Sequence, residues 1–419
     1  MRRVRGAPMS SPRRWLLPAC LALGLLLRLG FGWKHPSQPP GEALVNIDHY
    51  TELAVSLEQS GSLRLDGRPS ACREPGYPVV LGVAFKIFGR SYPVVLGTNC
   101  VLALLALCGL YLVGMDLFGR PTALLATAVG ACYPQFVFYA SQPVRETTIL
   151  AVSAWALWAL LRALRSPGAA AFAWAGVGGA LCGLTNVSLL PYGLVLAPAA
   201  VWLLNRSRGA AAWRWSGAYT AAFVLFYSVW PIRNYLALGT FIPTTTLPFG
   251  NIWYNYLVVP QAVGGTPLET EILRQDPVCR AAAGLDAVSA DRHYRKAARE
   301  WIRHHPGAYL RLVAWRFFWD QWRLWPRPQA AGDSYRLGRW VGLLTNGWII
   351  PLGWLGMIAA RCRPRRVLCV YLFVFALAFT HAQILTMLRY RTPIMPWLIL
   401  FAVSVLVRAG SWVNESMEN

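Results

Sequence analysis

Charged side chains are scarce in this chain, and acidic ones are the scarcest. Asp, Glu, Lys and Arg make up only 14% of its 419 residues, 18 residues are acidic, and 56% are hydrophobic. A soluble protein of this length needs more charge to cover its surface. Apolar runs of about 18 or more residues recur instead, which is typical of helices that cross a membrane. The sequence therefore predicts an all-α polytopic membrane protein.

Several catalytic and metal-binding motifs are also missing. The chain has no HExxH, no P-loop and no GxSxG, so nothing indicates a zinc protease, a P-loop nucleotide hydrolase or an α/β-hydrolase. Its nine cysteines include no CxxC pair and no Cys/His cluster. Most lie in apolar segments, where cysteine behaves as a small apolar residue. Cys72 and Cys279 are expected in external loops, and whether they form a disulfide stays open.

The charge balance is strongly basic, with 40 Lys and Arg residues and a net charge of +22. Such a surplus indicates either a nucleic-acid surface or the positive-inside rule of membrane proteins. The basic runs at 1–14 and 361–366 lie beside apolar segments, and no basic stripe marks a soluble domain. Nucleic acid is therefore not expected as a partner.

About ten apolar segments are expected to be membrane helices. They lie near residues 15–32, 93–115, 122–140, 146–164, 169–186, 187–204, 214–232, 340–360, 367–384 and 393–410. The stretch Tyr77–Phe88 is too short to span, because a spanning helix needs about 20 residues, so it is expected to be re-entrant or interfacial. Three parts follow from this division. They are an N-terminal membrane module (1–232) with a first external loop (33–92), a long external loop with interfacial helices (233–339), and C-terminal membrane helices with a short cytoplasmic tail (340–419).

The basic residues also predict the orientation. If the N-terminus lies inside, the short cytoplasmic segments hold sixteen Lys and Arg, and the short external loops hold nine over a greater length. Long loops such as 233–339 are discounted. Both termini are therefore expected in the cytoplasm. The first apolar segment follows Arg13 and Arg14 and lacks a small-residue cleavage site, so it is expected to stay as a helix.

The acidic residues are unevenly distributed across the predicted membrane. Fifteen of the eighteen fall in external loops, and five of these lie between Asn46 and Pro78. This stretch joins two long apolar segments. Chemistry that needs a carboxylate is therefore expected on the outer face.

The long external loop contains a segment, residues 291–326, in which Arg, Trp and Phe recur at helical spacing. This pattern predicts an amphipathic helix in the headgroup region. The alternative is a helix packed on a small external domain. The expected interface anchors are Trp301, Trp315, Trp319, Trp322 and Trp325.

Asp48 is the first candidate for chemistry, and several arginines are expected near it on the outer face. The alternative for Asp48 is an N-cap that satisfies free N–H groups of the helix it precedes. Each arginine alone fits a residue that snorkels to the interface. Together they suggest a phosphate site, because guanidinium binds phosphate in a fork and stays charged. These arginines are Arg28, Arg145, Arg233, Arg389 and Arg391.

The order of several short motifs resembles a known family over nearly the whole chain. They are DHYxxxA at 48–54, REPGYP at 73–78, RE at 145–146, WPIRNYxALGxFIP at 230–243, GNxW at 250–253 and RYRxPxMP at 389–396. In this order they look like the bacterial family 39 glycosyltransferases of the GT-C class. That class is similar to protein O-mannosyltransferases and aminoarabinose transferases.

The resemblance implies transfer of a sugar from a polyprenyl-phosphate donor to a lipid, glycan or protein hydroxyl. The site would lie on the outer face of the bacterial cytoplasmic membrane, and the displacement would invert the anomeric carbon. The essential aspartate of the class maps onto Asp48, which would accept the proton of the acceptor hydroxyl or orient that hydroxyl. Arg233 and Arg391 are the first choices for the donor phosphate, followed by Arg145, Arg389 and Arg28.

The remaining expected contacts and partners follow from the same resemblance. Membrane lipids and the lipid-linked donor are the expected partners, with no further cofactor. Many members carry an acidic pair where this chain has Asp48 followed by His49, which leaves a divalent metal possible but unsupported. Substrate contacts are expected from His49, Tyr50, Arg73, Glu74, Tyr77, Glu146, Asn234, Tyr235 and Asn251.

Two other functions remain open at this point. A transporter or flippase of an anionic lipid-linked substrate would line its path with the arginines. Transporters usually show repeated halves and charges near the midplane, whereas this chain has no clear repeat and carries its charge at the outer rim. The second alternative is a non-catalytic membrane scaffold, but such a protein would have no need for acidic residues concentrated on one face.

Overall fold

The computed structural model describes residues 15–37, 48–258, 267–325, 333–360, 364–384 and 386–417. All ten segments expected to be membrane helices are helical within these ranges. The predicted all-α architecture is confirmed. The principal helices are α1 (Leu16–Lys34), α4 (Tyr92–Leu117), α5 (Arg120–Cys132), α6 (Pro134–Ala140), α7 (Glu146–Arg165), α8 (Ala169–Thr185), α9 (Ala197–Asn205), α10 (Ala210–Tyr227), α17 (Asp333–Ala359), α18 (Pro364–Ile384) and α19 (Met395–Met417).

Fewer of these helices are long and apolar enough to cross a membrane than the sequence suggested. Six pass that test among the described residues, and the pair α5 and α6 would count as a seventh. The predicted single helix at 122–140 is instead bent by 56° between α5 and α6. Pro134 has no backbone N–H to continue the helix, and it forces Tyr133 into an extended conformation.

Other predicted spans are divided in the same way. The segment at 187–204 combines a 3-10 turn, a π-helical stretch and α9, and it passes the length test as Val187–Arg208. The segment at 214–232 is shared by α10 and α11 (Val229–Leu238), which meet at Ser228. The predicted boundaries were therefore less accurate than the predicted helices.

The first loop forms a compact unit between α1 and α4. It contains α2 (Tyr50–Ser60), a two-stranded hairpin of β1 (Arg64–Leu65) and β2 (Arg68–Pro69), and α3 (Gly76–Phe88). Asp66 and Gly67 form the hairpin turn with φ of +50° and +74°, which suits Asp-Gly. Helix α3 packs on α2, so close that a Cβ at Gly82 would lie 3.0 Å from the Ala54 carbonyl oxygen.

The long loop consists of short helices rather than one long amphipathic helix. They are α11, α12 (Pro248–Ile252), α13 (Pro267–Gln275), α14 (Pro277–Ala282), α15 (Ala287–His304) and α16 (Pro306–Phe318). The predicted helix at 291–326 breaks at His305, because Pro306 cannot continue it.

The two halves of that segment behave differently. Tyr294 and Ala298 of α15 pack into a small cluster with α12, as in the alternative of an external domain. At the end of α16, Trp315 and the following Trp319 stack at 5.8 Å and are 53% and 66% exposed, and their role as interface anchors stays a prediction. The other expected anchors are more enclosed: Trp301 packs against His305 and Trp322 against Trp354.

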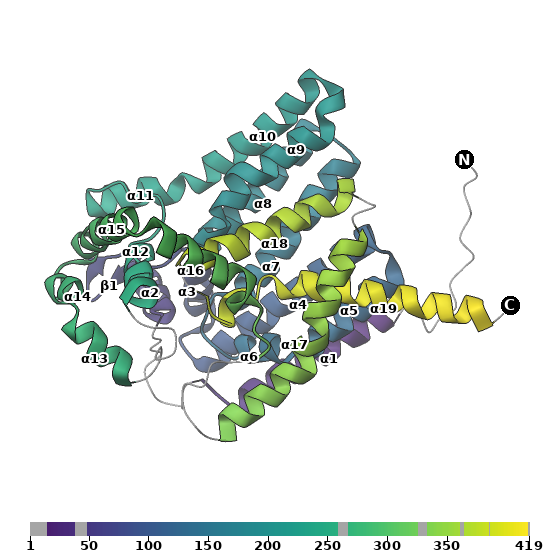
Figure 1. Ribbon diagram of the computed structural model, residues 1–419, viewed down its shortest axis with the longest axis horizontal. Helices are drawn as coiled ribbons and strands as arrows, with labels where there is room; N and C mark the ends of the chain where they lie inside the picture. Colours follow the sequence, from purple (N-terminus) through teal and green to yellow (C-terminus); the bar gives the residue numbers. More distant parts are fainter. Residues whose placement is uncertain are drawn as a thin grey trace.

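The main core is built by α4, α7, α8, α10, α18 and α19. Small residues allow close approach of these helices, as in many membrane bundles. At Gly176 of α8 an added Cβ would lie 2.2 Å from the Tyr219 carbonyl oxygen of α10. Figure 1 shows the short helices of both loops at one end of the bundle and the C-terminal end of α19 at the other.

Candidate active site

Asp48 lies between two guanidinium groups. Arg73 Nη2 donates to Asp48 Oδ1 at 2.7 Å, and Arg73 Nε donates to the Asp48 carbonyl oxygen at 2.8 Å. Arg389 Nη1 donates to the other carboxylate oxygen, Oδ2. Helix α2 has His49 rather than Asp48 at its N-cap position, with no side-chain cap. Among the contacts of the described residues, the carboxylate of Asp48 therefore pairs with these two arginines.

Two further ion pairs adjoin Asp48. Arg389 also donates to both carboxylate oxygens of Glu146, at 3.1 Å to Oε2. Arg145 donates to Glu74 Oε2, and Glu74 Oε1 accepts the backbone N–H of Val187 at 3.0 Å. We refer to Asp48, Arg73, Glu74, Arg145, Glu146 and Arg389 as the ion-pair cluster. The formal charges of its three arginines and three carboxylates cancel.

The cluster is assembled from segments that lie far apart in the sequence. Asp48 precedes α2, and Arg73 and Glu74 follow the hairpin just before α3. Arg145 is the N-cap of α7 and Glu146 its first residue. A carboxylate in the first turn interacts favourably with the positive end of the helix dipole. Arg389 lies in the 3-10 turn Arg389–Arg391 between α18 and α19. Loop residues at the helix ends, held by a rigid bundle, thus build the site.

Neighbouring charges keep Asp48, Arg145 and Arg389 ionised. Burial by itself raises the pKa of Asp48, but the charges of Arg389 and Arg73 outweigh it and hold that pKa below its ordinary value. Burial lowers the pKa of Arg389, and the nearby carboxylates of Glu146 and Asp48 more than reverse this. The pKa of Arg145 is raised in the same way, chiefly by Glu74. Asp48 is therefore a carboxylate that holds no proton at neutral pH.

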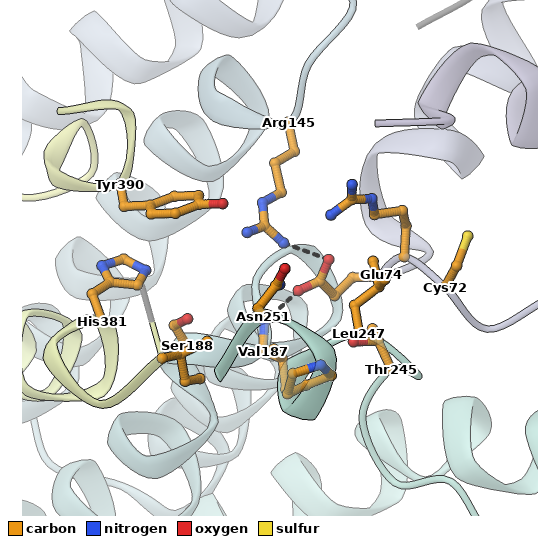
Figure 2. Close-up of a pocket in the computed structure, with 13 residues that line it drawn as sticks. Cys72, Glu74, Arg145, Val187, Ser188, Thr245, Leu247, Asn251, His381 and Tyr390 are labelled. Atoms are coloured by element: carbon orange, nitrogen blue, oxygen red, sulfur yellow. Dashed lines mark hydrogen bonds and ion pairs between the residues drawn. The ribbon is translucent and has the colours of Figure 1, made fainter. Parts of the chain in front are cut away.

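A polar cavity opens beside the cluster. It has a volume of about 50 Å³. Figure 2 shows the Glu74–Arg145 pair on one side of it and the rings of Tyr390 and His381 on the other. The residues that line it are Cys72, Arg73, Glu74, Arg145, Val187, Ser188, Thr245, Leu247, Pro248, Asn251, His381, Ile384 and Tyr390.

Aromatic rings support the arginines. The Arg73 guanidinium lies over the ring of Tyr50, 5.6 Å from its centroid. Tyr50 in turn packs edge-on against the fully buried Tyr77, with ring centroids 5.6 Å apart. The predicted substrate residues Tyr50 and Tyr77 thus underlie the site, where a cation over a ring is favourable.

Three predicted phosphate ligands are engaged elsewhere. Arg233 donates to the carbonyl oxygens of Leu63 and Ser70 at 2.6 and 2.7 Å, which ties α11 to the first loop. Arg391 is fully buried and donates to two backbone carbonyl oxygens, at 2.7 Å in the shorter bond. Arg28 donates to those of Gly24 and Ala131 and joins α1 to α5.

These contacts reverse the order of the arginines. Arg233 and Arg391, the first choices from the sequence, act in the structure as links between backbone segments. Arg389, ranked behind them, contacts Asp48 directly. A phosphate role for Arg233, Arg391 and Arg28 stays a prediction that no contact described above supports.

The other predicted substrate residues are divided. Asn251 lines the cavity. Asn234 is buried and donates to the Ile242 carbonyl oxygen at 2.9 Å, and Tyr235 is exposed. His49 lies 3.1 Å from Glu52 and has a φ of +60° in the turn that presents Asp48. The structure therefore groups Asn251 with the cluster and places Asn234 in a supporting position.

Ser188, His381 and Tyr390 are among the cavity residues that sequence reasoning missed. Tyr390 lies within the RYR motif that was noted only for its arginines. His381 is an ionisable residue near the end of a predicted membrane helix, which is by itself a signal of function. Ser188 follows a long apolar helix and carries no such signal.

The described residues include neither a disulfide between the two loop cysteines nor a cluster of metal-ligand side chains. Cys72 and Cys279 both carry free thiols. Within the described ranges no three His, Cys, Asp or Glu side chains gather as a metal site. The carboxylates of Asp48, Glu74 and Glu146 each face a guanidinium instead.

Residues 69–233 match the family described as dolichyl-phosphate-mannose-protein mannosyltransferase. This region includes Arg73, Glu74, Arg145 and Glu146 of the ion-pair cluster. No curated protein sequence matches the chain significantly.

Solved structures of an archaeal oligosaccharyltransferase share the fold. The oligosaccharyltransferase AglB from Archaeoglobus fulgidus, in complex with an inhibitory peptide and a dolichol-phosphate, is 14% identical with a TM-score of 0.58. Its apo form is 13% identical with a TM-score of 0.59, and in both cases the match covers 98% of this chain and 52% of the other. ArnT from Cupriavidus metallidurans bound to undecaprenyl phosphate is 15% identical with a TM-score of 0.42, covering 94% of this chain and 78% of that one.

This chain spans about half the length of AglB. The resemblance to GT-C glycosyltransferases inferred from the sequence is confirmed by the family match and by this fold. The chain is accordingly a multi-pass membrane protein with the fold of GT-C enzymes.

Proposed function

We propose that this protein is an integral-membrane glycosyltransferase that moves a sugar from a polyprenyl-phosphate donor to a hydroxyl acceptor. The observation that carries the proposal is the position of Asp48. Its carboxylate is held by Arg73 and Arg389 beside a polar cavity, on a GT-C fold. A carboxylate next to convergent guanidinium groups suits a reaction that removes a proton and releases a phosphate.

The donor class follows from charge and from the similar proteins. One AglB structure contains a dolichol-phosphate, and the matched family is described by a dolichyl-phosphate sugar. A polyprenyl phosphate carries negative charge, for which a guanidinium fork is well suited. We assign the contact with the donor phosphate to Arg389 and Arg145, because Arg389 donates to Asp48 and Arg145 lines the cavity.

The neutral charge of the cluster has a consequence for donor binding. With three arginines matched by three carboxylates, an incoming phosphate competes with Asp48 and Glu146 for Arg389. When the phosphate takes that guanidinium, Asp48 loses a partner that lowers its pKa, and it becomes a stronger base. Donor binding thereby prepares Asp48 for the acceptor.

The transfer exchanges one bond at the anomeric carbon for another. The acceptor hydroxyl oxygen forms a bond to the anomeric carbon, and the bond from that carbon to the phosphate oxygen breaks. The electron pair leaves on the lipid phosphate, where Arg389 and Arg145 stabilise the added charge. The hydroxyl proton passes to Asp48. A positioned base of this kind contributes about 10²–10⁴-fold to the rate.

The acceptor and the location belong to the same proposal. The acceptor is a lipid, glycan or protein hydroxyl, and one AglB structure holds a tethered acceptor peptide. The basic residues favour cytoplasmic termini, which puts the loops with the ion-pair cluster on the outer face of the cytoplasmic membrane.

The test is sugar transfer by purified protein in proteoliposomes supplied with labelled polyprenyl-phosphate mannose and a bacterial membrane extract as acceptor. Asp48→Asn is expected to lower transfer at least 10²-fold, because the amide accepts no proton. Glu58→Gln is the matched control, since Glu58 lies in the same loop but forms an exposed ion pair with Arg90.

Full transfer by the Asp48→Asn variant would remove Asp48 from the mechanism. Uptake of the labelled lipid into sealed vesicles, with no glycosylated product, would favour the transporter alternative instead. Both results come from the same preparation, because the label is followed in lipid and product fractions.

A further inference from the structure

His381 lies in the last turn of α18 and takes no part in the ion pairs. It is 3% exposed, and neither ring nitrogen has a hydrogen-bond partner within the described residues. Buried polar atoms of native proteins nearly always have partners, so such a ring calls for a ligand. The ring of Tyr390 stacks on it, with centroids 5.2 Å apart and planes inclined by 26°, which holds its orientation.

The ring borders the cavity beside the ion-pair cluster. Figure 2 shows His381 across the cavity from Glu74, with Ser188 below it and Asn251 near the centre. Neither the Ser188 hydroxyl nor the Asn251 amide is required by the ion pairs. The side chains of His381, Ser188 and Asn251 thus border one space that Arg145 also lines.

The size of this space limits what it accepts. One water molecule needs roughly 10–15 Å³ of cavity volume. A cavity of about 50 Å³ therefore holds about three to five groups of the size of a hydroxyl. That is room for the polar edge of a sugar ring and not for a prenyl chain. The polar side chains of the cavity also favour a sugar over a lipid chain. A lipid chain would leave their imidazole, amide and hydroxyl groups without hydrogen-bond partners.

The chemistry of the lining matches hydroxyl groups. A neutral imidazole has one N–H donor and one acceptor nitrogen, an amide has both kinds of atom, and a serine hydroxyl does both. A sugar hydroxyl also donates and accepts. Phosphate, which only accepts at full charge, is better served by the neighbouring guanidinium of Arg145.

We propose that His381, Ser188 and Asn251 form a subsite that binds hydroxyl groups of the donor sugar and selects which sugar is transferred. This inference rests on the proposed function. The donor sugar is favoured over the acceptor because its anomeric carbon is joined directly to the phosphate. A phosphate on Arg145 therefore brings the sugar to the cavity that Arg145 lines.

The experiment measures equilibrium binding to the purified full chain in nanodiscs, without requiring transfer. The probes are polyprenyl phosphate and a panel of polyprenyl-phosphate hexoses and pentoses that differ at single hydroxyls. His381→Phe should weaken the best glycosylated probe about tenfold, the effect of one lost hydrogen bond, and change polyprenyl phosphate less than twofold. His381→Asn, which keeps a donor and an acceptor, should recover part of the loss.

His304→Phe provides the matched control, because His304 is exposed on α15 and bonds only its own helix, at the Glu300 carbonyl oxygen, in the described structure. It should leave both affinities unchanged. The wild-type protein should bind a probe that lacks the sugar hydroxyl contacted by His381 more weakly than the probe that has it. His381→Phe should bind these two probes with equal affinity.

Several results would overturn the subsite. In His381→Phe, the affinities for polyprenyl phosphate and for the glycosylated probe could fall equally, or both could stay unchanged. Alternatively, the wild-type protein could bind no glycosylated probe more tightly than bare polyprenyl phosphate. If donor binding is unchanged in His381→Phe, a changed acceptor KM of this variant in the proteoliposome transfer assay would place the acceptor there instead. Failure of the proposed function is seen separately, as transfer that survives Asp48→Asn while sugar-selective binding still depends on His381.

Discussion

At the scale of single residues, Arg389 connects the two halves of the site. Its guanidinium reaches Asp48 through Nη1 and Glu146 through Nε and Nη2, so all three of its nitrogens are used. The motif RYR offers two arginines that look equivalent in the sequence. Their roles differ because the 3-10 turn points Arg389 to the carboxylates and Arg391 to backbone carbonyls.

Arg389→Lys is expected to lower the rate of transfer about a hundredfold. A lysine keeps the charge but cannot bind Asp48, Glu146 and a phosphate through a planar fork. The measurement is kcat/KM for the donor in proteoliposomes. Arg90→Lys, in the exposed pair with Glu58, should change little, and equal activity of both variants would argue against the assignment.

The lowered pKa of Asp48 predicts the pH dependence. The ion pairs stabilise the fold fully above the pKa of the unfolded carboxyl, and this contribution is lost as pH falls through the lower folded pKa. Arg73→Gln removes one of the charges that lower this pKa. The acid limb of the pH–rate profile should therefore move to higher pH, by about one unit.

The check on this prediction is a pair of pH profiles, one for transfer and one for thermal stability, in wild type and Arg73→Gln. Both acid limbs should shift in the same direction. An unchanged transfer profile in the variant would mean that Asp48 does not set the acid limb.

At the scale of elements, the site depends on where helices begin. Arg145 and Glu146 stand at the start of α7, and Arg73 and Glu74 just precede α3. Prolines explain other helix ends, since Pro134 follows the end of α5 and Pro306 the end of α15, where hydropathy alone would continue the helix. The predicted helices were therefore correct in kind and inaccurate in length.

Helix packing makes a second prediction at this scale. Gly176→Ala should destabilise the protein by about 1–3 kcal/mol, because its Cβ would lie 2.2 Å from the Tyr219 carbonyl oxygen and force α8 from α10. Gly217→Ala, on α10 with nothing within 4 Å of its Cβ, is the control. Unfolding in detergent with increasing denaturant compares the two, and similar midpoints would contradict this packing argument.

At the scale of the whole molecule, the polar loops occupy one end of an apolar bundle. The cluster takes residues from four separate segments, and the cavity adds α12 and α18. Deleting the first loop, which carries Glu74, would leave Arg145 buried without this carboxylate, which is costly. The first loop and α12 of the long loop therefore both contribute to one site.

The orientation can be tested on intact cells with a membrane-impermeant thiol reagent. His304→Cys, at the exposed end of α15, should react in intact cells. Ser166→Cys, exposed after α7 at a predicted cytoplasmic turn, should react only after permeabilisation. The wild-type protein measures the background from native thiols. The reverse pattern would place the site on the cytoplasmic face.

The sequence by itself determined the class of protein and predicted where its chemistry occurs. Hydropathy predicted a helical membrane bundle, because spans must satisfy their backbone hydrogen bonds internally and so form helices. The uneven acids pointed to the outer loops, and motif order pointed to Asp48. These properties are local or summed along the chain, so they can be read without a fold.

Only the tertiary structure decided which side chains meet. Arg233, Arg389 and Arg391 have the same chemistry and similar settings in the sequence, and their partners lie between about 70 and 340 positions away. His381 and Ser188 face one cavity because α18 packs against the turn after α8. Contacts over such separations depend on how helices pack, which no local pattern records.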